Sequence, residues 1–520
     1  MAAHTAPRVT PARWMSFHPG DLVAGLSVAC VLVPQSLAYA ELAGMPAFHG
    51  LFAAVFPPIA AAFAASSPYL QTGPVAMTAL LTFGALSVRA QPGSEAYVAL
   101  AGMLALGVGL VRLLFGLARL GWVAYLMSQP VVTGFTSAAA LVIIGSQLPT
   151  ALGVAAGDGS LLARTWSAAS HPTLWEPASV GLSGATLVLV LLGPRVHALF
   201  PGVLVAVVLG VAFSRATGYG GPVIGTIPAG LPPIAWPVVW SELPNLAVPA
   251  IIIALVGFAE PAAIARIYAV QDRRPWSPNR EFVSQGLANV ASGVAAGFPV
   301  GGSFSRTSVN RLAGGQTRWS GAVTGLVVLA FLPFAGLLSA MPRAVLGAIV
   351  IGAVVRLVTP VELWRLARVS GPQAGVAAAT FGLTLALSPR VDQAVLVGIG
   401  LAGVVHIWRE LRVQVRTSFH DGTLELEPQG VLFFGSAPDL EEALVGQVSA
   451  HPDARRLVLD LEELGRIDYT GAVTLATVVE EAETAGLAVR IAHVPPHAQR
   501  ILTGVFGPDR LERLAAGPSA

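Results

Sequence analysis

The residues with the clearest capacity for chemistry lie in one stretch rich in glycine and serine, residues 297–310, with the sequence GFPVGGSFSRTSVN. It contains one arginine, Arg306, and lies between two strongly apolar segments. A bilayer core tolerates irregular backbone or an isolated cation only where they line a protected cavity. A helix beginning near Ser303 would add free N–H groups and about half a positive charge at its N-terminus. The stretch therefore predicts an anion-binding site inside a membrane.

The candidate anion ligands are the groups at the start of this helix. Backbone amides and hydroxyls can replace the hydration shell of an oxyanion, and the guanidinium group supplies positive charge. A mid-membrane arginine costs about 2.5 to 3.5 kcal/mol on insertion scales, so Arg306 needs a partner. The alternative is a structural ion pair with Glu260, or an arginine that reaches the membrane surface. The predicted binding residues are Gly302, Ser303, Phe304, Ser305 and Arg306.

A matching segment, QTGPVAMTALLT, lies in the first part of the chain. Gly73 permits a close approach, and Pro74 suits the first position of a helix because its missing N–H is not needed there. We therefore predict another half-helix that opens at Gly73 and Pro74, with Val75 and Ala76 as further binding residues. The alternative is a simple kink in an ordinary membrane span.

The two segments occupy corresponding places in two halves of the chain. Pro74 lies 53 residues after Asp21, where the first apolar segment starts, and Ser303 lies 55 residues after Val248. Paired segments interrupted by glycine or proline, at corresponding positions of two halves, indicate the binding site of a transporter. The spacing therefore favours two repeats, at about residues 19–215 and 245–412.

The first apolar segment contains VPQSLAYAELAG and with it three polar side chains. Gln35 and Tyr39 are four residues apart and share one helix face, from which both could reach an anion; a buried tyrosine satisfied by a neighbour is equally consistent. Glu41 is the only carboxylate between Asp21 and Glu95. Poor solvation favours the protonated form of a carboxylate, which suits a group that binds and releases a proton. The alternative is an interfacial glutamate that caps a loop.

Another carboxylate, Glu260, lies in the apolar segment IIIALVGFAEPAAIARIYA, directly before Pro261. It could carry a proton, bind a coupling cation or neutralise Arg306. We therefore predict Glu41 and Glu260 as coupling residues, with H⁺ as the coupling ion and Na⁺ as the alternative. No cofactor is expected.

These residues need a membrane domain to position them, and the composition predicts one. Hydrophobic residues make up 54% of the chain and charged residues 11%, whereas soluble domains average about 25% charged residues. We predict an all-α polytopic membrane domain at residues 19–412. Its fourteen expected segments are 21–42, 47–65, 74–88, 95–119, 131–149, 177–193, 199–213, 246–269, 281–298, 303–313, 316–340, 342–359, 371–388 and 391–408.

The placement of arginine predicts the orientation. With a cytoplasmic N-terminus most arginines fall on the inner side, as the positive-inside rule requires. Residues 1–18 and the C-terminal tail would then be cytoplasmic, in a protein of a bacterial-type inner membrane. The outer side holds Arg89, Arg164, Arg215, Arg343 and Arg390. The inner loops and helix ends hold Arg8, Arg13, Arg112, Arg119, Arg195, Arg266, Arg273, Arg274, Arg280, Arg311, Arg318, Arg356, Arg365, Arg368, Arg409, Arg412 and Arg416.

Several function classes are disfavoured. All 30 basic residues are arginine, so the chain lacks a P-loop lysine and direct use of ATP is not expected. The net charge of +2 suggests no nucleic-acid partner. The lone Cys30 suits apolar packing. Neither a nucleophile–base set nor a metal-ligand cluster is readable in the spans or the tail, so we expect neither an enzyme nor a metal site.

From about Thr417 the sequence becomes that of a small α/β domain of about a hundred residues, 417–515. TLELEPQGVLFFGSA predicts two strands, RRLVLDL and LAVRIAHV one strand each, and three helices follow from DLEEALVGQVS, TGAVTLATVVEEAETAG and HAQRILTGVF. Asp468, Tyr469, Thr470 and Gly471 fall at a strand-to-helix turn. Thr470 is a candidate regulatory phosphorylation site, although a plain N-cap is favoured.

Taken together, VPQSLAYAELAG, QTGPVA, GFPVGGSFSRTSVN and the LDL…DYTG tail resemble the SulP family of anion transporters, over residues 15–515. The tail is similar to a STAS domain. The resemblance implies two inverted repeats of seven segments, divided into a core and a gate domain, with the anion between the N-termini of the third and tenth segments. It also implies that Gln35 and Tyr39 line the site, that Arg306 is the basic residue of the tenth segment, and that the chain forms homodimers.

In proton-coupled members of this family a glutamate follows the same Q-x-x-A-Y-A pattern, so Glu41 implies proton symport by an elevator-like movement. Tyr469 stands where serine is common in STAS domains, which makes phosphorylation there less expected. The resulting hypothesis is secondary active import of a small anion with protons, preferably a dicarboxylate such as fumarate, with sulfate or bicarbonate also possible. The alternatives are sodium-dependent bicarbonate uptake, nucleobase–proton symport in the related inverted-repeat fold, and a tail that binds a cytoplasmic partner. The other expected contact is membrane lipid.

Overall fold

The computed structural model of the chain describes residues 16–125, 127–155, 157, 159–197, 199–228, 230–237, 239–410 and 413–516. These form two compact units, the first ending at Gly400 and the second beginning at Leu401. Most of the predicted N-terminal segment 1–18 lies outside the described residues, as do Arg8, Arg13 and Arg412.

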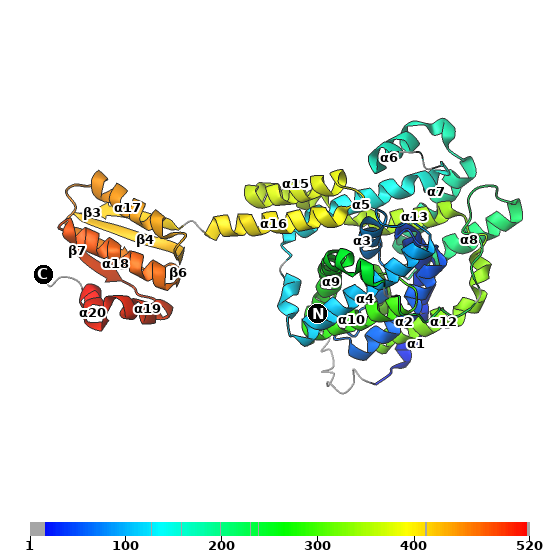
Figure 1. Cartoon of the computed structure of the whole chain (residues 1–520), viewed down its shortest axis with the longest axis horizontal. Coiled ribbons are helices and arrows are strands. Elements are labelled where there is room, and N and C mark those ends of the chain that lie inside the picture. Colours follow the sequence, from blue (N-terminus) through cyan, green and yellow to red (C-terminus); the bar gives the residue numbers. More distant parts are fainter. Residues whose placement is uncertain are drawn as a thin grey trace. The chain divides into compact units, whose positions relative to one another are not determined.

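The first unit is helical (Figure 1). Each of the fourteen predicted segments contains a helix, so this prediction is confirmed. The helices are α1 (Pro19–Leu42), α2 (Phe48–Ala64), α3 (Ala76–Leu86), α4 (Glu95–Leu117), α5 (Gln129–Leu152), α7 (Pro177–Val196), α8 (Gly202–Thr217), α9 (Leu243–Gln271), α10 (Pro278–Val294), α11 (Phe304–Leu312), α12 (Trp319–Phe331), α13 (Arg343–Val354), α15 (Gly371–Ala386) and α16 (Val391–Glu410). Among the described residues, eight helical stretches are long and apolar enough to cross a membrane.

Two further helices were not predicted, α6 (Leu161–Ser170) and α14 (Pro360–Val369). Each has only 10 residues. The sequence of α14, PVELWRLARV, alternates charged and apolar residues and has no apolar run. A search for long apolar segments therefore misses both helices.

Helix starts follow local capping chemistry. His18 and Asp21 form a reciprocal capping box at α1, with Pro19 in the first turn. Ser94 and Ser277 accept hydrogen bonds from backbone amides at the starts of α4 and α10. Such caps satisfy amides that lack a partner within the helix.

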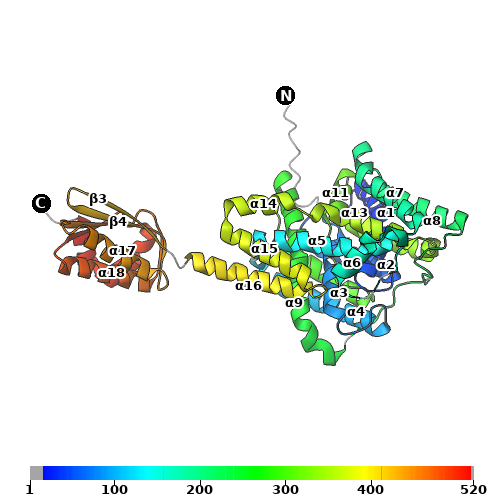
Figure 2. The same cartoon turned by 90° about the horizontal axis from the view of Figure 1, so that it is seen from above.

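The helices pack in two groups, which we name the core group and the gate group. In the core group α10 packs against α4 and α2, while α12 packs against α2 and α1. In the gate group α5 packs against α15 and α13, and α13 also against α7 (Figure 2). The groups meet where α1 contacts α8 and α13 and where α3 contacts α5. This division agrees with the core and gate domains that the resemblance implied.

Two short strands cross at the centre of the core group. β1 (Thr72–Gly73) pairs antiparallel with β2 (Gly301–Gly302), with Thr72 opposite Gly302 and Gly73 opposite Gly301. Each strand shortly precedes a short helix, α3 or α11. The segments that the sequence matched between the two halves are thus hydrogen-bonded neighbours, as expected of an inverted repeat.

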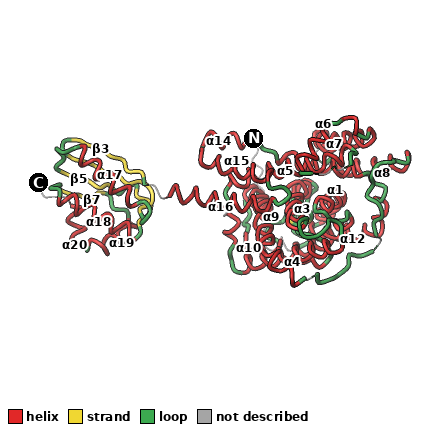
Figure 3. The backbone as a smooth tube through the Cα atoms, turned by 45° about the horizontal axis from the view of Figure 1, so that its top comes forward, coloured by secondary structure: helices red, strands yellow, loops and turns green. Residues whose placement is uncertain are grey.

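The second unit is a five-stranded sheet with helices (Figure 3). Its elements are β3 (Gln414–His420), β4 (Thr423–Leu432), α17 (Ala437–Ala450), β5 (Arg456–Asp460), β6 (Leu464–Ile467), α18 (Tyr469–Thr484), β7 (Ala488–Ala492), α19 (Pro496–Phe506) and α20 (Pro508–Ala516). The strand order is β3-β4-β5-β7, with β6 beside β4. β4, β5 and β7 are parallel, and β3 is antiparallel to β4.

Three predictions for this unit are wrong in detail. TLELEPQGVLFFGSA forms one strand rather than two, because β4 pairs with β5 at residues 423–426 and then with β6 at residues 430–432. β6 is only four residues long and was missed. HAQRILTGVF is not the last helix, since α20 follows it after Gly507.

Candidate functional site

The site is built around the N-termini of α3 and α11. Val75 is the N-cap of α3 and Ser303 is the N-cap of α11, and the side chain of neither one caps its helix. The prediction that a helix begins near Ser303 is confirmed. The prediction that Pro74 opens its helix is wrong by two positions, since α3 begins at Ala76. The reason is that Gly73 is still part of the extended strand that crosses β2, and Pro74 links that strand to the N-cap.

The predicted site cation, Arg306, is fully buried. Its Nη1 donates to Oε1 of Gln35 at 3.3 Å, while Nε and Nη2 have no hydrogen-bond partner among the described residues. Nη2 lies 3.5 Å from the place that a Cβ would take at Gly73. The structure therefore brings Gln35, Gly73 and Arg306 together and leaves two donors of the guanidinium group available.

The remaining predicted ligands surround this guanidinium group. Tyr39 lies one turn after Gln35 on α1 and is also buried. Ser303 is buried, whereas Phe304 and Ser305 are exposed in the described structure. The hydroxyls of Ser303 and Ser305 lie 3.2 Å apart. Val75, Ala76 and Gly302 are buried beside them.

Glu260 interacts with the start of α11. Its Oε1 accepts a hydrogen bond of 3.2 Å from the backbone N–H of Phe304, the first residue of the helix. The direct partner of Arg306 is Gln35. The structure therefore shows two separate interactions in place of a direct Glu260–Arg306 hydrogen bond: Glu260 with the amide of Phe304, and Arg306 with Gln35. The partial positive charge at the start of α11 also attracts the Glu260 carboxylate.

A cavity of about 490 Å³ opens beside these groups. It is lined by residues of the core group and by residues of α5 from the gate group, so it lies between the two groups. Its volume is typical of small-molecule sites, which are about 300–1,000 Å³. The polar or charged lining includes Gln129, Thr136, Glu260 and Arg266, and the half-helix starts contribute Val75 and Phe304. Sequence reasoning missed Gln129, Thr136 and Arg266, because nothing local relates α5 to this cavity.

A row of polar residues on α10 holds the crossing strands in place. Gln285 donates to the Thr72 hydroxyl at 2.7 Å. The Asn289 side chain accepts from the N–H of Val300 at 2.9 Å and donates to its carbonyl at 3.1 Å. Sequence reasoning missed both residues. The signal was the unusually polar sequence SQGLANVAS in a segment read as membrane-spanning.

Arg112 supports the same strand from α4. It was counted among the arginines of inner loops and helix ends, and its side chain is fully buried in the structure. Its guanidinium group donates to the carbonyls of Ile253, Ala254 and Val300 at 3.0–3.2 Å. These three carbonyls accept hydrogen bonds from the buried guanidinium group. The position of Arg112 along the chain does not reveal these partners.

Glu41 lies away from the anion site. A helix turns about 100° per residue, so Glu41 points about 200° away from Tyr39. Its Oε1 lies 3.3 Å from Nε of Arg343, the first residue of α13. The predicted proton carrier therefore faces the gate group.

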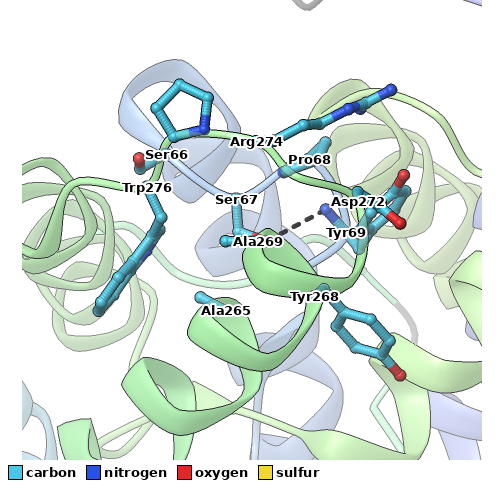
Figure 4. Close-up of a pocket in the computed structure, with 11 residues that line it drawn as sticks. Ser66, Ser67, Pro68, Tyr69, Ala265, Tyr268, Ala269, Asp272, Arg274 and Trp276 are labelled. Carbon is cyan, nitrogen blue, oxygen red and sulfur yellow. Dashed lines mark hydrogen bonds between the residues drawn. The ribbon is translucent and has the colours of Figure 1, made fainter. Parts of the chain in front are cut away.

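A small pocket lies between the C-terminal end of α9 and residues 66–69 of the loop before β1 (Figure 4). Arg311 pairs with Asp272 at 2.6 Å and lies over the rings of Tyr69 and Tyr268. The pocket has a volume of only about 10 Å³, which is at the lower limit for one water molecule. This cluster joins helix ends and is not a binding site for an anion.

In the second unit, Asp468 and not Thr470 is the N-cap of α18, because its carboxylate accepts from the N–H of Gly471 at 2.7 Å. Thr470 is exposed in the first turn. The expectation of no metal-ligand cluster in the tail is wrong in one respect. Side-chain donor atoms of Asp460, Glu462 and His493 lie within 4.8 Å of one another, because β5 and β7 are adjacent in the sheet.

Comparisons with known proteins identify the family of this chain. The sulfate permease family model matches residues 19–380, and a STAS domain model matches residues 414–505. A probable sulfate transporter of Mycobacterium tuberculosis is 37% identical over 75% of this chain and 70% of its own length. Sulfate transporter 4.1 of Arabidopsis thaliana is 33% identical over 76% of this chain and 59% of its own length.

Solved structures share the fold. The murine Solute Carrier 26 family member A9 anion transporter, in the inward-facing state, matches 97% of this chain and 92% of its own with a TM-score of 0.84 at 20% identity. The transmembrane domain of a cyanobacterial bicarbonate transporter, BicA, matches 74% of this chain and 98% of its own with a TM-score of 0.63 at 27% identity. The family match covers most of the chain, and the STAS match covers its tail. The chain is a multi-pass membrane protein that belongs to the sulfate permease family of anion transporters.

Proposed function

We propose that this protein imports a small oxyanion together with protons, as a secondary active transporter. The observation that carries the proposal is Arg306, fully buried between two half-helix starts with Nε and Nη2 free of partners among the described residues. A buried guanidinium group with available donors requires a counter-charge, and a planar or tetrahedral oxyanion supplies one. Sulfate is the first substrate to test, because relatives more than 30% identical are named as sulfate transporters. Fumarate-like dicarboxylates and bicarbonate are the other members of the proposed class.

In this proposal each side chain has a defined part. The guanidinium group of Arg306 binds the oxyanion, while Gln35 holds its orientation through the 3.3 Å hydrogen bond. The free amides at the starts of α3 and α11 add the two helix dipoles. Tyr39, Ser303 and Ser305 offer hydroxyl groups.

Coupling to protons is assigned to Glu41 and Glu260. Glu260 already accepts from the amide of Phe304, and an arriving anion competes with it for the start of α11. Protonation of Glu260 removes this repulsion, so proton and anion binding favour each other. Glu41 lies at the boundary of the two helix groups, where its charge affects their relative movement.

Transport would proceed by an elevator-like movement of the core group against the gate group. The support is the cavity between the groups and the small set of contacts that join them. We further propose a homodimer in the inner membrane, with both termini in the cytoplasm and a STAS domain available to a cytoplasmic partner.

The test is uptake of labelled sulfate, fumarate and bicarbonate into proteoliposomes, with and without an inward proton gradient. We expect the gradient to stimulate uptake of one of these anions, and Arg306→Gln to abolish it. Arg266→Gln is a matched control that removes an arginine of the cavity wall without touching the half-helices. Uptake that does not depend on the proton gradient would refute proton coupling. Normal uptake by Arg306→Gln would refute the role of Arg306 in anion binding.

Sodium-dependent bicarbonate uptake is a second candidate. It is favoured by Glu260, a carboxylate in the cavity wall beside the backbone of α11, and by the likeness to a bicarbonate transporter at 27% identity. Carboxylate and backbone oxygens are suitable ligands for a hard cation. Bicarbonate uptake that requires sodium at fixed pH, and is lost in Glu260→Gln, would establish it.

A further inference from the structure

The ion pair between Glu41 and Arg343 joins the two helix groups. Glu41 belongs to α1 of the core group and Arg343 to α13 of the gate group, and these helices contact each other. We propose that Arg343 is a positioning residue for proton coupling: it holds α1 against α13 while Glu41 is ionised, and releases it when Glu41 is protonated. This inference rests on the proposed proton-coupled transport.

The positions of the two charges indicate that the pair does more than stabilise the fold. Glu41 lies in the last turn of α1, where the helix end carries partial negative charge. Arg343 is the first residue of α13, where the helix end carries partial positive charge. Each side chain is therefore disfavoured by the partial charge at the end of its own helix. Two unfavourable charge placements at a single contact are expected at a functional site.

The geometry also suits a contact that must break. One Arg343 nitrogen lies 3.3 Å from one Glu41 oxygen, with side-chain exposures of 49% and 20%. A paired arginine and carboxylate often form two parallel hydrogen bonds, and this pair has a single close approach. The two side chains are therefore close enough for Arg343 to favour the ionised form of Glu41. They are also exposed enough for water to deliver a proton to Glu41.

No other charge on the neighbouring helices competes for Glu41, because each described titratable group there has its own partner. α1 packs against α2, α3, α8, α11, α12 and α13. The helices α3 and α12 carry no titratable residue. The others are His49 with the carbonyl of Ala296, Arg215 with the carbonyl of Leu337, Arg306 with Gln35, and Arg311 with Asp272. On α1 itself, Asp21 accepts from Gln316 and Thr317. Cys30 lies about three turns before Glu41, and Tyr39 points to the opposite side of the helix.

The proton step balances without another reactant. A proton from water on one side of the membrane binds the Glu41 carboxylate and forms its O–H bond, while Arg343 stays cationic. The attraction between the two side chains falls to that of a charge and a dipole, and α1 can move past α13. Loss of the proton to the other side restores the ion pair.

The experiment measures the pH dependence of proteoliposome uptake, with sulfate, fumarate and bicarbonate each as probe, for the whole chain and three variants. Arg343→Gln removes the positive neighbour of Glu41, so we expect the pH of half-maximal uptake to rise by about one unit. Arg343→Lys keeps the charge and should keep the wild-type midpoint. Arg215→Gln, at the end of a gate helix without a carboxylate partner, should keep it as well.

The outcomes separate this inference from the function on which it rests. Wild-type uptake that does not respond to protons refutes the proposed coupling itself. A proton-responsive wild type with an unchanged midpoint in Arg343→Gln refutes only the role of Arg343. If Arg343→Gln does not fold, Arg343→Lys and the double variant Glu41→Gln with Arg343→Gln decide. The double variant should have the same pH midpoint as Glu41→Gln alone, because Arg343 has no carboxylate to hold once Glu41 is neutral, and a different midpoint would contradict the inference.

Discussion

At the scale of single residues, Arg306 combines complete burial with free donors. The cost of burying a cation is offset in most proteins by a full set of partners, as Arg112 shows with three backbone carbonyls. Arg306 has one partner, Gln35. Two buried arginines in one domain thus differ in their hydrogen bonds, and the sequence around them does not reveal this difference.

Replacing Arg306 by lysine tests the planar geometry of the site. Lysine keeps the charge but loses the fork of N–H donors that matches an oxyanion. We expect the KM for the transported anion to rise about 10-fold or more, equivalent to about 1.4 kcal/mol. Initial uptake rates over a range of anion concentrations check this.

The matched control for this substitution is Arg266→Lys. Arg266 lines the neighbouring cavity from α9 and is not at a half-helix start. We expect its KM to stay within about twofold of wild type, a difference below about 0.5 kcal/mol. Equal losses in the two variants would show that the cavity needs positive charge in general and not the placement of Arg306.

At the scale of elements, the crossing of β1 and β2 positions the half-helices, and α10 fixes the crossing. Asn289→Ala leaves the buried N–H of Val300 without its side-chain partner, which costs about 1–3 kcal/mol. We expect lower affinity for the anion in protein that still reaches the membrane, because β2 is no longer held. Binding and uptake measured on the same purified preparation check both parts.

An asparagine on the surface provides the control for Asn289→Ala. Asn245 is exposed and donates to Glu242 at 3.0 Å. Asn245→Ala should keep both affinity and thermal stability. If Asn289→Ala also keeps wild-type affinity, the half-helices do not depend on α10 for their position.

Sequence patterns predicted the elements well where one local property decides them. Long apolar runs gave eleven of the fourteen membrane segments, and the repeated Gly/Pro breaks gave the half-helices, whereas the strands β1 and β2 were not predicted. The amphipathic α14 and the four-residue β6 were missed because neither has such a property. The pairing of Glu41 with Arg343 joins residues that are remote in sequence, and only the packing of α1 on α13 reveals it.

At the scale of the whole molecule, the chain consists of two units with separate hydrophobic cores. The second unit has its own buried cluster, which includes Leu426, Leu459, Leu475 and Ile491. A single core of this kind supports independent folding. We therefore expect a fragment of residues 413–516 to be folded on its own and to unfold cooperatively.

The stability of that fragment should decrease between pH 6 and pH 8. The imidazole of His493 lies 2.8 Å from the Asp460 carboxylate, and this hydrogen bond raises the pKa of His493. A raised histidine pKa contributes stability that is complete below the unfolded value of about 6.5 and is lost as the pH rises through the folded value. Urea unfolding at both pH values measures the effect.

The histidine variants identify the source of this pH dependence. His493→Ala should reduce the difference in unfolding free energy between pH 6 and pH 8. His497→Ala removes an exposed histidine at the start of α19 and should leave the difference unchanged. A pH dependence that persists in His493→Ala would exclude the pair with Asp460 as its cause.

The pairing of β1 with β2 also sets the order in which the protein can be assembled. α3 has 11 residues, so it extends about 16 Å and cannot cross a hydrocarbon layer of about 30 Å by itself. The edge of β1 stays unpaired until β2 emerges from the ribosome, roughly 230 residues later and about 10–50 s at normal rates of synthesis. During that interval the nascent chain holds an incomplete strand within the membrane, and the proposed anion site cannot form before α11 has been made.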